Sequence, residues 1–147
     1  MFDHILVVCA GNICRSPIAE RMLQRELADK QVISAGLITE KSHIVGNSAY
    51  PPMIDVANQI GITLTDHKAQ QLTQALCDWS DLILVMEHAH IDRVASQFKQ
   101  VRNKTFLLGQ WASGSIDDPF GQGLMACIES SHKIEQACQG WVKRLSA

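Results

Sequence analysis

The chain has 147 residues, of which 46% are hydrophobic and 19% charged, and its formal net charge is −2 at pH 7. This length supports one substantial hydrophobic core and no second one, so we expect a single domain over residues 1–147. The small net charge and the lack of basic clusters exclude a nucleic-acid surface. The five cysteines are odd in number and irregularly spaced, which favours a reducing compartment over a secreted disulfide scaffold.

The sequence contains no apolar stretch of membrane-spanning length. Asp3 and His4 come directly before the first apolar run, so the N-terminus lacks the basic start and apolar core of a signal peptide. We therefore expect a cytoplasmic protein without membrane insertion, either a monomer or a weak dimer.

Strands and helices are predicted to alternate along the chain. The uncharged, β-branched run Ile5-Leu6-Val7-Val8 indicates a buried strand over 4–8, and a helix is expected over 16–28, with Glu20 and its polar neighbours opposite the apolar side. The further expected elements are a strand near 31–34, a helix over 52–60, a helical piece near 71–77, a strand over 81–86, a helix near 88–98, a strand over 104–108, a loop over 109–122 and a helix over 123–145. This order predicts an α/β fold: a three-layer sandwich with a four-stranded parallel sheet and helices on both faces. The irregular segment 37–52 is long for a compact domain and is predicted to form a functional wall.

The connection from the first strand to the first helix reads Cys9-Ala10-Gly11-Asn12-Ile13-Cys14-Arg15-Ser16. Unpaired backbone N–H groups and the positive end of the helix dipole converge there, so this loop is predicted to hold a phosphate. A helix N-terminus and a neighbouring cation lower the pKa of a cysteine thiol, so Cys9 is expected to act as a thiolate nucleophile. Arg15 offers a planar fork for two phosphoryl oxygens. Gly11 lets the backbone approach the ligand, and Asn12 tolerates a left-handed conformation.

A second candidate for chemistry is Asp118, in the run Asp117-Asp118-Pro119. Cleavage of a phosphate monoester requires a proton for the departing oxygen, which a carboxylic acid can supply. Pro119 biases the preceding residue toward an extended backbone that presents the carboxylate. An ordinary acidic turn is the alternative explanation of the same residues.

The run from Val8 to Pro17 matches in full the pattern Val-Cys-x-Gly-Asn-x-Cys-Arg-Ser-Pro, and the chain resembles the low-molecular-weight protein tyrosine phosphatases of the bacterial type. Further matches follow in order at Ser34-Ala35-Gly36, His67-Lys68-Ala69, the apolar run 81–86 and Asp118-Pro119-Phe120-Gly121. The resemblance implies hydrolysis of phosphotyrosine and other aryl phosphates through a cysteinyl-phosphate on Cys9. It implies that Asp118 is the general acid, with Asp117 the next candidate, and that no metal or cofactor takes part.

The resemblance also implies roles for the residues around the nucleophile. Ala10, Gly11, Asn12, Ile13, Cys14 and Ser16 would form the phosphate-binding loop together with Arg15. Ser16, Ser34 and His67 would hold Asn12 by hydrogen bonds, and Ser16 would also assist departure of the Cys9 thiolate. From the residues alone, Ser16 could equally be a helix cap and His67 a surface histidine. Ile13 and Phe120 would flank the flat ring of the substrate.

The chain departs from the family pattern in three places. Phe120 is followed by Gly121 instead of a second aromatic residue, Gln70 stands where a basic residue is often found, and the segment between Gly36 and Pro51 is longer than in many relatives. The only tyrosine of the sequence is Tyr50, so the C-terminal tyrosine phosphorylation suggested for some eukaryotic members has no counterpart beside Asp118. The contribution of residues 37–50 to substrate preference stays open.

The remaining cysteines have two possible uses. Cys14 is close enough to Cys9 for a disulfide that caps the nucleophile reversibly, or it simply packs under the loop. Cys77, Cys127 and Cys138 are predicted to be core residues, the last two on one face of the final helix.

The expected partner is a phosphotyrosine protein. In bacterial members of the family it is often a tyrosine autokinase of capsule or exopolysaccharide export. Two other functions stay open, an arsenate reductase and a non-catalytic phosphotyrosine-binding module. Such reductases use two further cysteines seven residues apart, a spacing that is absent here, and retention of both Cys9 and Asp118 argues against a binding module.

Overall fold

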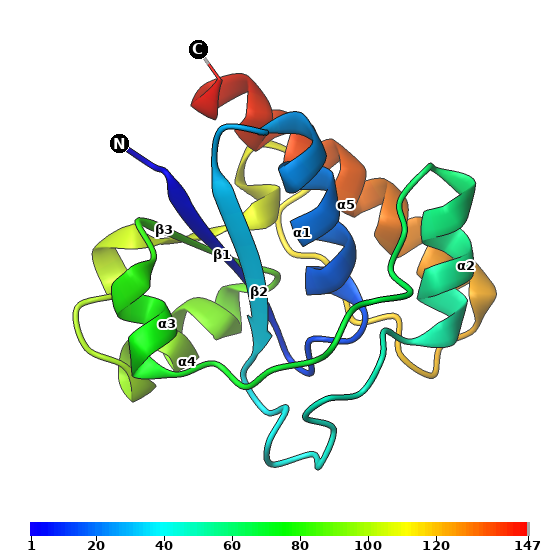
Figure 1. Ribbon diagram of the computed structural model, residues 1–147, viewed down its shortest axis with the longest axis horizontal. Helices are drawn as coiled ribbons and strands as arrows, with labels where there is room; N and C mark the ends of the chain where they lie inside the picture. Colours follow the sequence, from blue (N-terminus) through cyan, green and yellow to red (C-terminus); the bar gives the residue numbers. More distant parts are fainter. Residues whose placement is uncertain (147) are drawn as a thin grey trace.

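The computed structural model describes residues 1–146 and has a parallel sheet at its centre (Figure 1). Its strands are β1 (His4–Cys9), β2 (Gln31–Gly36), β3 (Leu82–Val85) and β4 (Thr105–Leu107), in the order β2-β1-β3-β4. All three pairings between neighbours are parallel. The predicted four-stranded parallel sheet is therefore confirmed, and β1, which ends at Cys9, is one of its two central strands.

Five α-helices and two short 3-10 helices connect or follow the strands. The α-helices are α1 (Arg15–Glu26), α2 (Pro51–Gln59), α3 (Gln74–Trp79), α4 (His88–Gln97) and α5 (Leu124–Leu145), and the 3-10 helices are η1 (Arg102–Lys104) and η2 (Leu108–Trp111). In Figure 1, α1, α2 and α5 lie on one side of the sheet and α3 and α4 on the other. The predicted three-layer α/β sandwich is confirmed.

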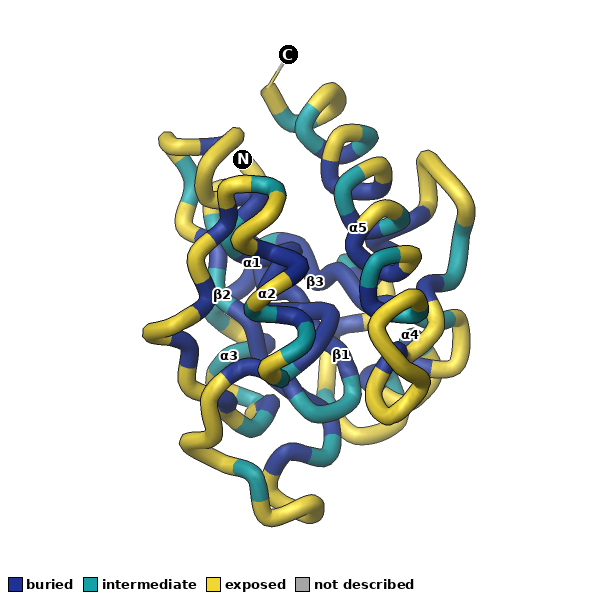
Figure 2. Tube along the Cα trace, turned by 90° about the vertical axis from the view of Figure 1, so that its right-hand side faces the viewer, coloured by how far each residue is buried: buried dark blue, intermediate teal, exposed yellow. Residues whose placement is uncertain are grey.

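The side chains of β1 alternate between two hydrophobic clusters. Ile5 and Val7 belong to the cluster under α1, α2 and α5, whereas Leu6 and Val8 belong to the cluster under α3 and α4. All four are 0% exposed, and Figure 2 shows the strands as the buried centre of the molecule. Because Ile5 to Val8 are all packed on one side of the sheet or the other, the position of Cys9 at the end of the strand is tightly fixed.

Several boundaries differ from the prediction. β2 continues to Gly36 and α3 begins only at Gln74, because Gln71 forms an isolated parallel bridge to Gly36 instead of starting a helix. The predicted loop over 109–122 contains part of η2, which brings the Trp111 ring to 5.9 Å from that of Trp141 on α5. Aromatic packing against the last helix explains this short helical turn. Across residues 1–146, no helix combines the length and hydrophobicity needed to cross a bilayer.

Candidate active site

The strand β1 ends at Cys9 and α1 begins at Arg15, so the predicted phosphate loop (residues 9–16) lies at the carboxyl edge of the sheet, where open α/β folds place their ligands. A cavity of about 290 Å³ opens above it. It is lined by Cys9, Ala10, Gly11, Ile13, Cys14 and Arg15 from the loop, by Ile38, Ser42 and Ile44 from the segment after β2, and by Asp118 and Phe120. A larger, open hollow of about 900 Å³ lies around the amino end of β1, and its lining holds no cysteine.

The Cys9 thiol is held at the floor of this cavity and is 2% exposed. The Asn12 backbone N–H donates to its Sγ at 3.3 Å, and the Ser16 Oγ lies 3.0 Å from the same sulfur. Ser16 Oγ already accepts a bond from Asn12 Nδ2, so its own proton is free for the sulfur. Both donors favour negative charge on Cys9. Ser16 is not a helix cap, because it lies inside α1 and the residue at the cap position makes no side-chain bond.

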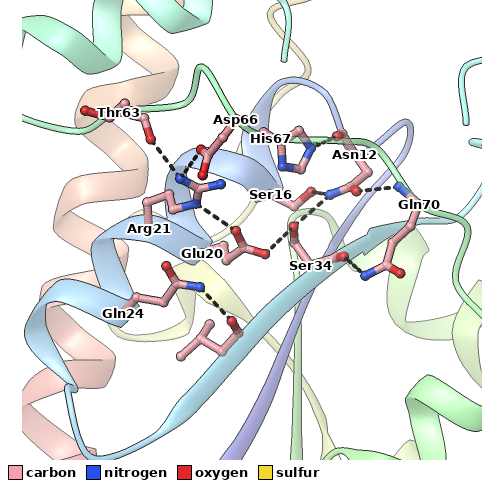
Figure 3. A network of polar contacts seen from close by, with 11 residues as sticks. Asn12, Ser16, Glu20, Arg21, Gln24, Ser34, Thr63, Asp66, His67 and Gln70 are labelled. Carbon is pink, nitrogen blue, oxygen red and sulfur yellow. Dashed lines mark hydrogen bonds and ion pairs between the residues drawn. The ribbon is translucent and has the colours of Figure 1, made fainter. Parts of the chain in front are cut away.

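Asn12 is buried with a φ of 63°, a conformation that costs energy for any residue but glycine. Four groups hold it there, as Figure 3 shows. Its Nδ2 donates to Ser16 Oγ at 2.8 Å and to Ser34 Oγ at 2.9 Å. Its Oδ1 accepts from Gln70 N at 2.9 Å, and its carbonyl oxygen lies 2.6 Å from His67 Nε2. This set includes the three side chains expected to support the loop and adds Gln70.

His67 is 6% exposed, so its alternative interpretation as a surface histidine is wrong. Burial lowers the pKa of its imidazole, while the bond to Asn12 acts in the opposite direction. A neutral ring keeps its single proton on the nitrogen that meets a carbonyl. His67 Nε2 therefore donates to the Asn12 carbonyl and keeps the left-handed residue in place.

A chain of polar residues extends this support to the surface. Ser34 Oγ donates to Glu20 Oε1 at 2.9 Å, and Arg21 joins Glu20 Oε2 at 3.1 Å to Asp66 Oδ1 at 2.8 Å. The expectation that Glu20 lies on the solvent side of its helix is wrong, since the residue is 9% exposed. The amphipathic pattern misled here because a buried carboxylate is tolerated where hydrogen bonds satisfy it.

Arg15 is 1% exposed, and its guanidinium is fixed from behind. Nη1 donates to Glu87 Oε2 and to the Ile116 carbonyl, each at 2.7 Å, and Nη2 lies 3.8 Å from Asp118 Oδ2. Burial alone would lower the pKa of Arg15, but the charges of Cys9, Glu87 and Asp118 outweigh it and raise that pKa. Its Nε is buried without a partner, which leaves a donor for an anion in the loop.

Glu87 was not singled out from the sequence, although a signal existed. It follows β3 by two residues, and β3 is the neighbour of β1 in the sheet. Polar residues just after neighbouring parallel strands meet at the same edge. That rule could have placed Glu87 beside Arg15.

Asp118 lies at the mouth of the cavity and its side chain is 46% exposed. Its Oδ1 accepts a bond from the Phe120 N–H at 3.1 Å. Asp117 lines a separate hollow against α5 and does not line the cavity above Cys9. Asp118 also lines that hollow, and of the two carboxylates it is the one that lines the cavity above the thiol as well.

The five cysteines are free thiols, and each of them is buried. Cys77, Cys127 and Cys138 lie in the two hydrophobic clusters, as predicted. Cys14 is 3% exposed in the phosphate loop. Burial, followed by the negative charges of Asp118 and Cys9, raises the pKa of its thiol well above the ordinary value.

The segment 37–50 runs alongside the phosphate loop and lines part of the cavity. The sequence predicted such a wall because the segment is unusually long. It bonds to four carbonyl groups of the loop at 2.8 to 3.0 Å. The pairs are Leu37 N to Cys9 O, Ile38 N to Ala10 O, Thr39 Oγ1 to Gly11 O and Tyr50 N to Ile13 O. Its cavity-lining side chains, Ile38, Ser42 and Ile44, were not identified from the sequence because loop residues carry no periodic pattern.

Gly36 at the end of β2 makes this close approach possible. A Cβ built there would lie 2.8 Å from the Gly11 carbonyl carbon and 2.9 Å from the Ala10 oxygen, and would collide with Thr39 Oγ1. Only glycine fits between the strand end and the phosphate loop.

Comparison with known proteins gives the same assignment over the whole chain. Residues 4–147 match the family model of low molecular weight phosphotyrosine protein phosphatases. The chain is 46% identical to a probable low molecular weight protein-tyrosine-phosphatase, AmsI of Erwinia amylovora, over 99% of both chains. It is 40% identical to the low molecular weight protein-tyrosine-phosphatase Wzb of Escherichia coli K12, covering 100% of this chain and 98% of that protein.

A solved structure is also closely similar. Vibrio vulnificus Wzb in complex with benzylphosphonate superimposes with a TM-score of 0.95 at 43% identity, over 98% of this chain and 99% of that one. The family model, the two relatives and the similar structure all point to a tyrosine phosphatase, as does the cavity lined by Cys9 and Arg15. This chain belongs to the low molecular weight phosphotyrosine protein phosphatase family.

Proposed function

We propose that this protein-tyrosine phosphatase transfers the phosphoryl group of phosphotyrosine first to Cys9 and then to water. The groups around the Cys9 sulfur support this proposal most directly. Two donors, Asn12 N–H and Ser16 Oγ, meet it at 3.3 and 3.0 Å, and Arg15 and Asp118 line the same cavity. A nucleophile, an anion clamp and an acid are thereby present in one site.

In the first step the Cys9 thiolate attacks phosphorus, and the S–P bond forms as the P–O bond to the tyrosine ring breaks. Arg15 and the backbone N–H groups of the phosphate loop stabilise the negative equatorial oxygens. The protonated Asp118 gives its proton to the departing tyrosine oxygen, which would otherwise leave as a basic phenoxide.

In the second step the Asp118 carboxylate takes a proton from water, and the resulting hydroxyl attacks phosphorus. The S–P bond breaks and inorganic phosphate forms, while the electron pair returns to Cys9. Ser16 Oγ lies 3.0 Å from the sulfur and stabilises the departing thiolate by its hydrogen bond. Asp118 is available for both steps because, among residues 1–146, its carboxylate makes one hydrogen bond, with the Phe120 N–H, and one longer ion pair, with Arg15.

The cavity suits a flat ring. Ile13, Ile38 and Ile44 give it aliphatic sides, and Phe120 lies at the rim beside the acid. Its volume of about 290 Å³ is at the small end of ligand pockets, which favours one aromatic ring with its phosphate over a larger group. We propose that Ile13 and Phe120 form the two walls against the ring.

The acid assignment is tested by Asp118→Ala. We expect kcat/KM on phosphotyrosine, which reports the steps up to release of the leaving group, to fall by about 10²-fold to 10³-fold, and kcat/KM on para-nitrophenyl phosphate, whose leaving group is acidic, to fall much less. The measurement is the slope of log kcat/KM against leaving-group pKa, which must steepen. Asp117→Ala is the matched control, with an expected parental slope. A leaving-group slope of Asp118→Ala equal to that of the parent would assign the acid role to another residue. A larger change of that slope in Asp117→Ala would assign the role to Asp117.

The other two functions left open by the sequence receive less support. A disulfide relay needs thiols that can reach Cys9, but Cys77 lies in the cluster on the opposite side of the sheet. Cys127 and Cys138 are buried on α5. A steady-state assay with an aryl phosphate, run beside an arsenate-dependent thiol-oxidation assay, separates the phosphatase from the reductase and from an inactive binding module.

We further propose that the substrate is a phosphotyrosine protein, and the resemblance favours a bacterial tyrosine autokinase of capsule or exopolysaccharide export. A cytoplasmic location is supported by the chemistry, because Cys9 must stay a free thiol. A single domain over 1–147 is supported by β1, which contributes side chains to both hydrophobic clusters. We propose a monomer or weak dimer.

We propose that Cys14 protects the nucleophile from irreversible oxidation. Hydrogen peroxide transfers one oxygen to the Cys9 thiolate, which becomes a sulfenic acid, and the other oxygen leaves as hydroxide. The Cys14 thiolate then attacks that sulfur, a Cys9–Cys14 disulfide forms, and hydroxide leaves. Since the attacking group must be a thiolate and burial raises the pKa of Cys14, the protective step should accelerate as the pH rises.

After a peroxide pulse, the parent should regain most of its activity on adding dithiothreitol, and the recovered fraction should be larger at pH 8.5 than at pH 6.5. Cys14→Ser should recover little at either pH, whereas Cys127→Ser, a buried cysteine on α5, should behave as the parent does. Peptide mass mapping identifies the disulfide. Equal recovery in the parent and Cys14→Ser would leave Cys14 with a packing role alone.

A further inference from the structure

We propose that Tyr50 is a positioning residue that joins the loop bearing Asp118 to the phosphate loop and replaces the second aromatic residue that the Asp118 loop lacks. The inference rests on the proposed function, because its effect on catalysis acts through Asp118. Tyr50 does not line the cavity above Cys9, so it does not touch the substrate in this arrangement.

The main chain of Tyr50 is fixed at both of its polar groups. Its N–H donates to the carbonyl of Ile13 in the phosphate loop at 2.8 Å. Its own carbonyl accepts from Met53 N at 2.9 Å and from Ile54 N at 3.1 Å, and it caps the start of α2 just before Pro51. Tyr50 is therefore a fixed point between the floor of the site and a helix.

The side chain of Tyr50 reaches the Asp118 loop (residues 117–123) in two ways. Its ring packs on Phe120 with centroids 4.7 Å apart and planes tilted by 45°. Its hydroxyl oxygen accepts a hydrogen bond from the Gly121 N–H at 3.3 Å. Two segments that are 71 residues apart in the sequence therefore meet here.

The Asp118 loop needs such an anchor. Gly121 and Gly123 have φ values of 73° and 94° with open space around them, so this backbone has wide freedom in the absence of tertiary contacts. Most hydrogen bonds of the loop are local, such as Phe120 N to Asp118 Oδ1 and Gln122 N to Pro119 O. Within the described chain, the bond from Gly121 to Tyr50 is the only hydrogen bond between residues 117–123 and a distant segment, and the longer ion pair of Asp118 with Arg15, at 3.8 Å, is the other polar contact of this kind.

Through these contacts Tyr50 restrains both the aromatic wall, Phe120, and the acid, Asp118, of the loop. Phe120 is held by the Tyr50 ring, and the Phe120 N–H binds the Asp118 carboxylate. Because Gly121 directly follows Phe120, the Tyr50 hydroxyl restrains the backbone on the other side of that aromatic residue. A rigid Phe120 fixes one wall for the substrate ring and the distance of the acid from the leaving oxygen, and such positioning governs proton transfer.

The test compares Tyr50→Phe, which keeps the ring, with Tyr50→Leu, which removes it, in the full chain. Loss of a neutral hydrogen bond predicts a decrease of about threefold in kcat/KM on phosphotyrosine for Tyr50→Phe. Tyr50→Leu should lose about tenfold or more, since the aromatic pair is lost as well. On para-nitrophenyl phosphate kcat/KM should fall less in both variants, because its leaving group departs without a proton. In an Asp118→Ala background, Tyr50→Leu should add no further dependence on the leaving group.

Two controls separate positioning from general stability. Phe2→Ala removes another partly exposed aromatic ring, at the amino end of β1, and should leave the leaving-group slope unchanged. Amide hydrogen exchange at Gly121, a readout independent of turnover, should become faster in Tyr50→Phe than in the parent.

Steeper leaving-group slopes together with faster exchange at Gly121 would support the inference. Parental slopes, or equal losses on both substrates with a lower melting temperature, would overturn it and leave the proposed function standing. If the parent itself fails to hydrolyse either substrate, the proposed function fails. In that case the amide exchange of Gly121 still tests whether Tyr50 anchors the Asp118 loop. Exchange as slow in Tyr50→Phe as in the parent would show that it does not.

Discussion

Cys9→Ser should abolish turnover of para-nitrophenyl phosphate and phosphotyrosine, with kcat reduced by a factor on the order of 10⁴ or more. A serine hydroxyl stays protonated at neutral pH, and the hydrogen bonds from Asn12 and Ser16 do not change that. The rest of the site does not depend on the sulfur, so the phosphate loop should still bind inorganic phosphate. Calorimetric titration with phosphate and a turnover assay measure the two properties separately.

Cys127→Ser is the matched control for this change, because it replaces a buried cysteine on α5 with the same residue outside the phosphate loop. Its turnover should remain close to that of the parent. Undiminished turnover in Cys9→Ser would remove Cys9 from the mechanism. Loss of phosphate binding without loss of folding would show instead that the sulfur is a ligand of the anion.

The second large effect is expected at Arg15. Arg15→Lys keeps the positive charge but loses the planar fork, so one nitrogen would have to replace the contacts to Glu87 and Ile116 and also hold the phosphate. We expect kcat/KM to fall by about 10²-fold to 10³-fold, and phosphate inhibition to weaken as well. Arg15→Ala should lose more, since the positive charge in the phosphate loop and the ion pair with Glu87 are then both removed.

Arg102→Lys is the control for the Arg15 variants, since the Arg102 side chain is 67% exposed and, among residues 1–146, forms its ion pair with Asp92 alone, at the surface. It should leave kcat/KM unchanged. Because Arg15 is buried, a melting curve must accompany each measurement, and only folded variants are compared. A folded Arg15→Lys with parental kcat/KM would mean that the fork geometry is not used in the reaction.

The sequence predicted the fold and the position of the nucleophile because both depend on local patterns. The apolar runs at β1 and β3 are short, and the β1 run passes directly into a loop with its own signature. The alternation of strands and helices then allows few arrangements other than a parallel sheet. Since ligands bind at the carboxyl edge of such sheets, the end of the β1 run is enough to place Cys9 there.

The contacts between distant segments that hold the site together could not be predicted from local sequence patterns. Glu87 meets Arg15 across 72 positions, and Tyr50 meets Gly121 across 71. Such pairs depend on how the loops after β2, β3 and β4 converge, and side-chain periodicity carries no information about loops. The prediction for Glu20 failed for a different reason. The sequence pattern predicts a solvent-exposed helix position, but the hydrogen bond from Ser34 allows the Glu20 carboxylate to be buried there.

Cys9 is expected to carry the phosphoryl group during turnover. The most direct measurement uses Asp118→Ala with para-nitrophenyl phosphate, because the acidic leaving group departs without a proton while hydrolysis of the intermediate is slowed. Rapid acid quenching followed by peptide mass spectrometry should find one added phosphoryl group on the peptide that contains Cys9, and it should disappear in the Cys9→Ser variant. Phosphate on another residue, or turnover with no phosphorylated peptide and no burst of para-nitrophenol, would show that the reaction does not pass through a cysteinyl-phosphate on Cys9.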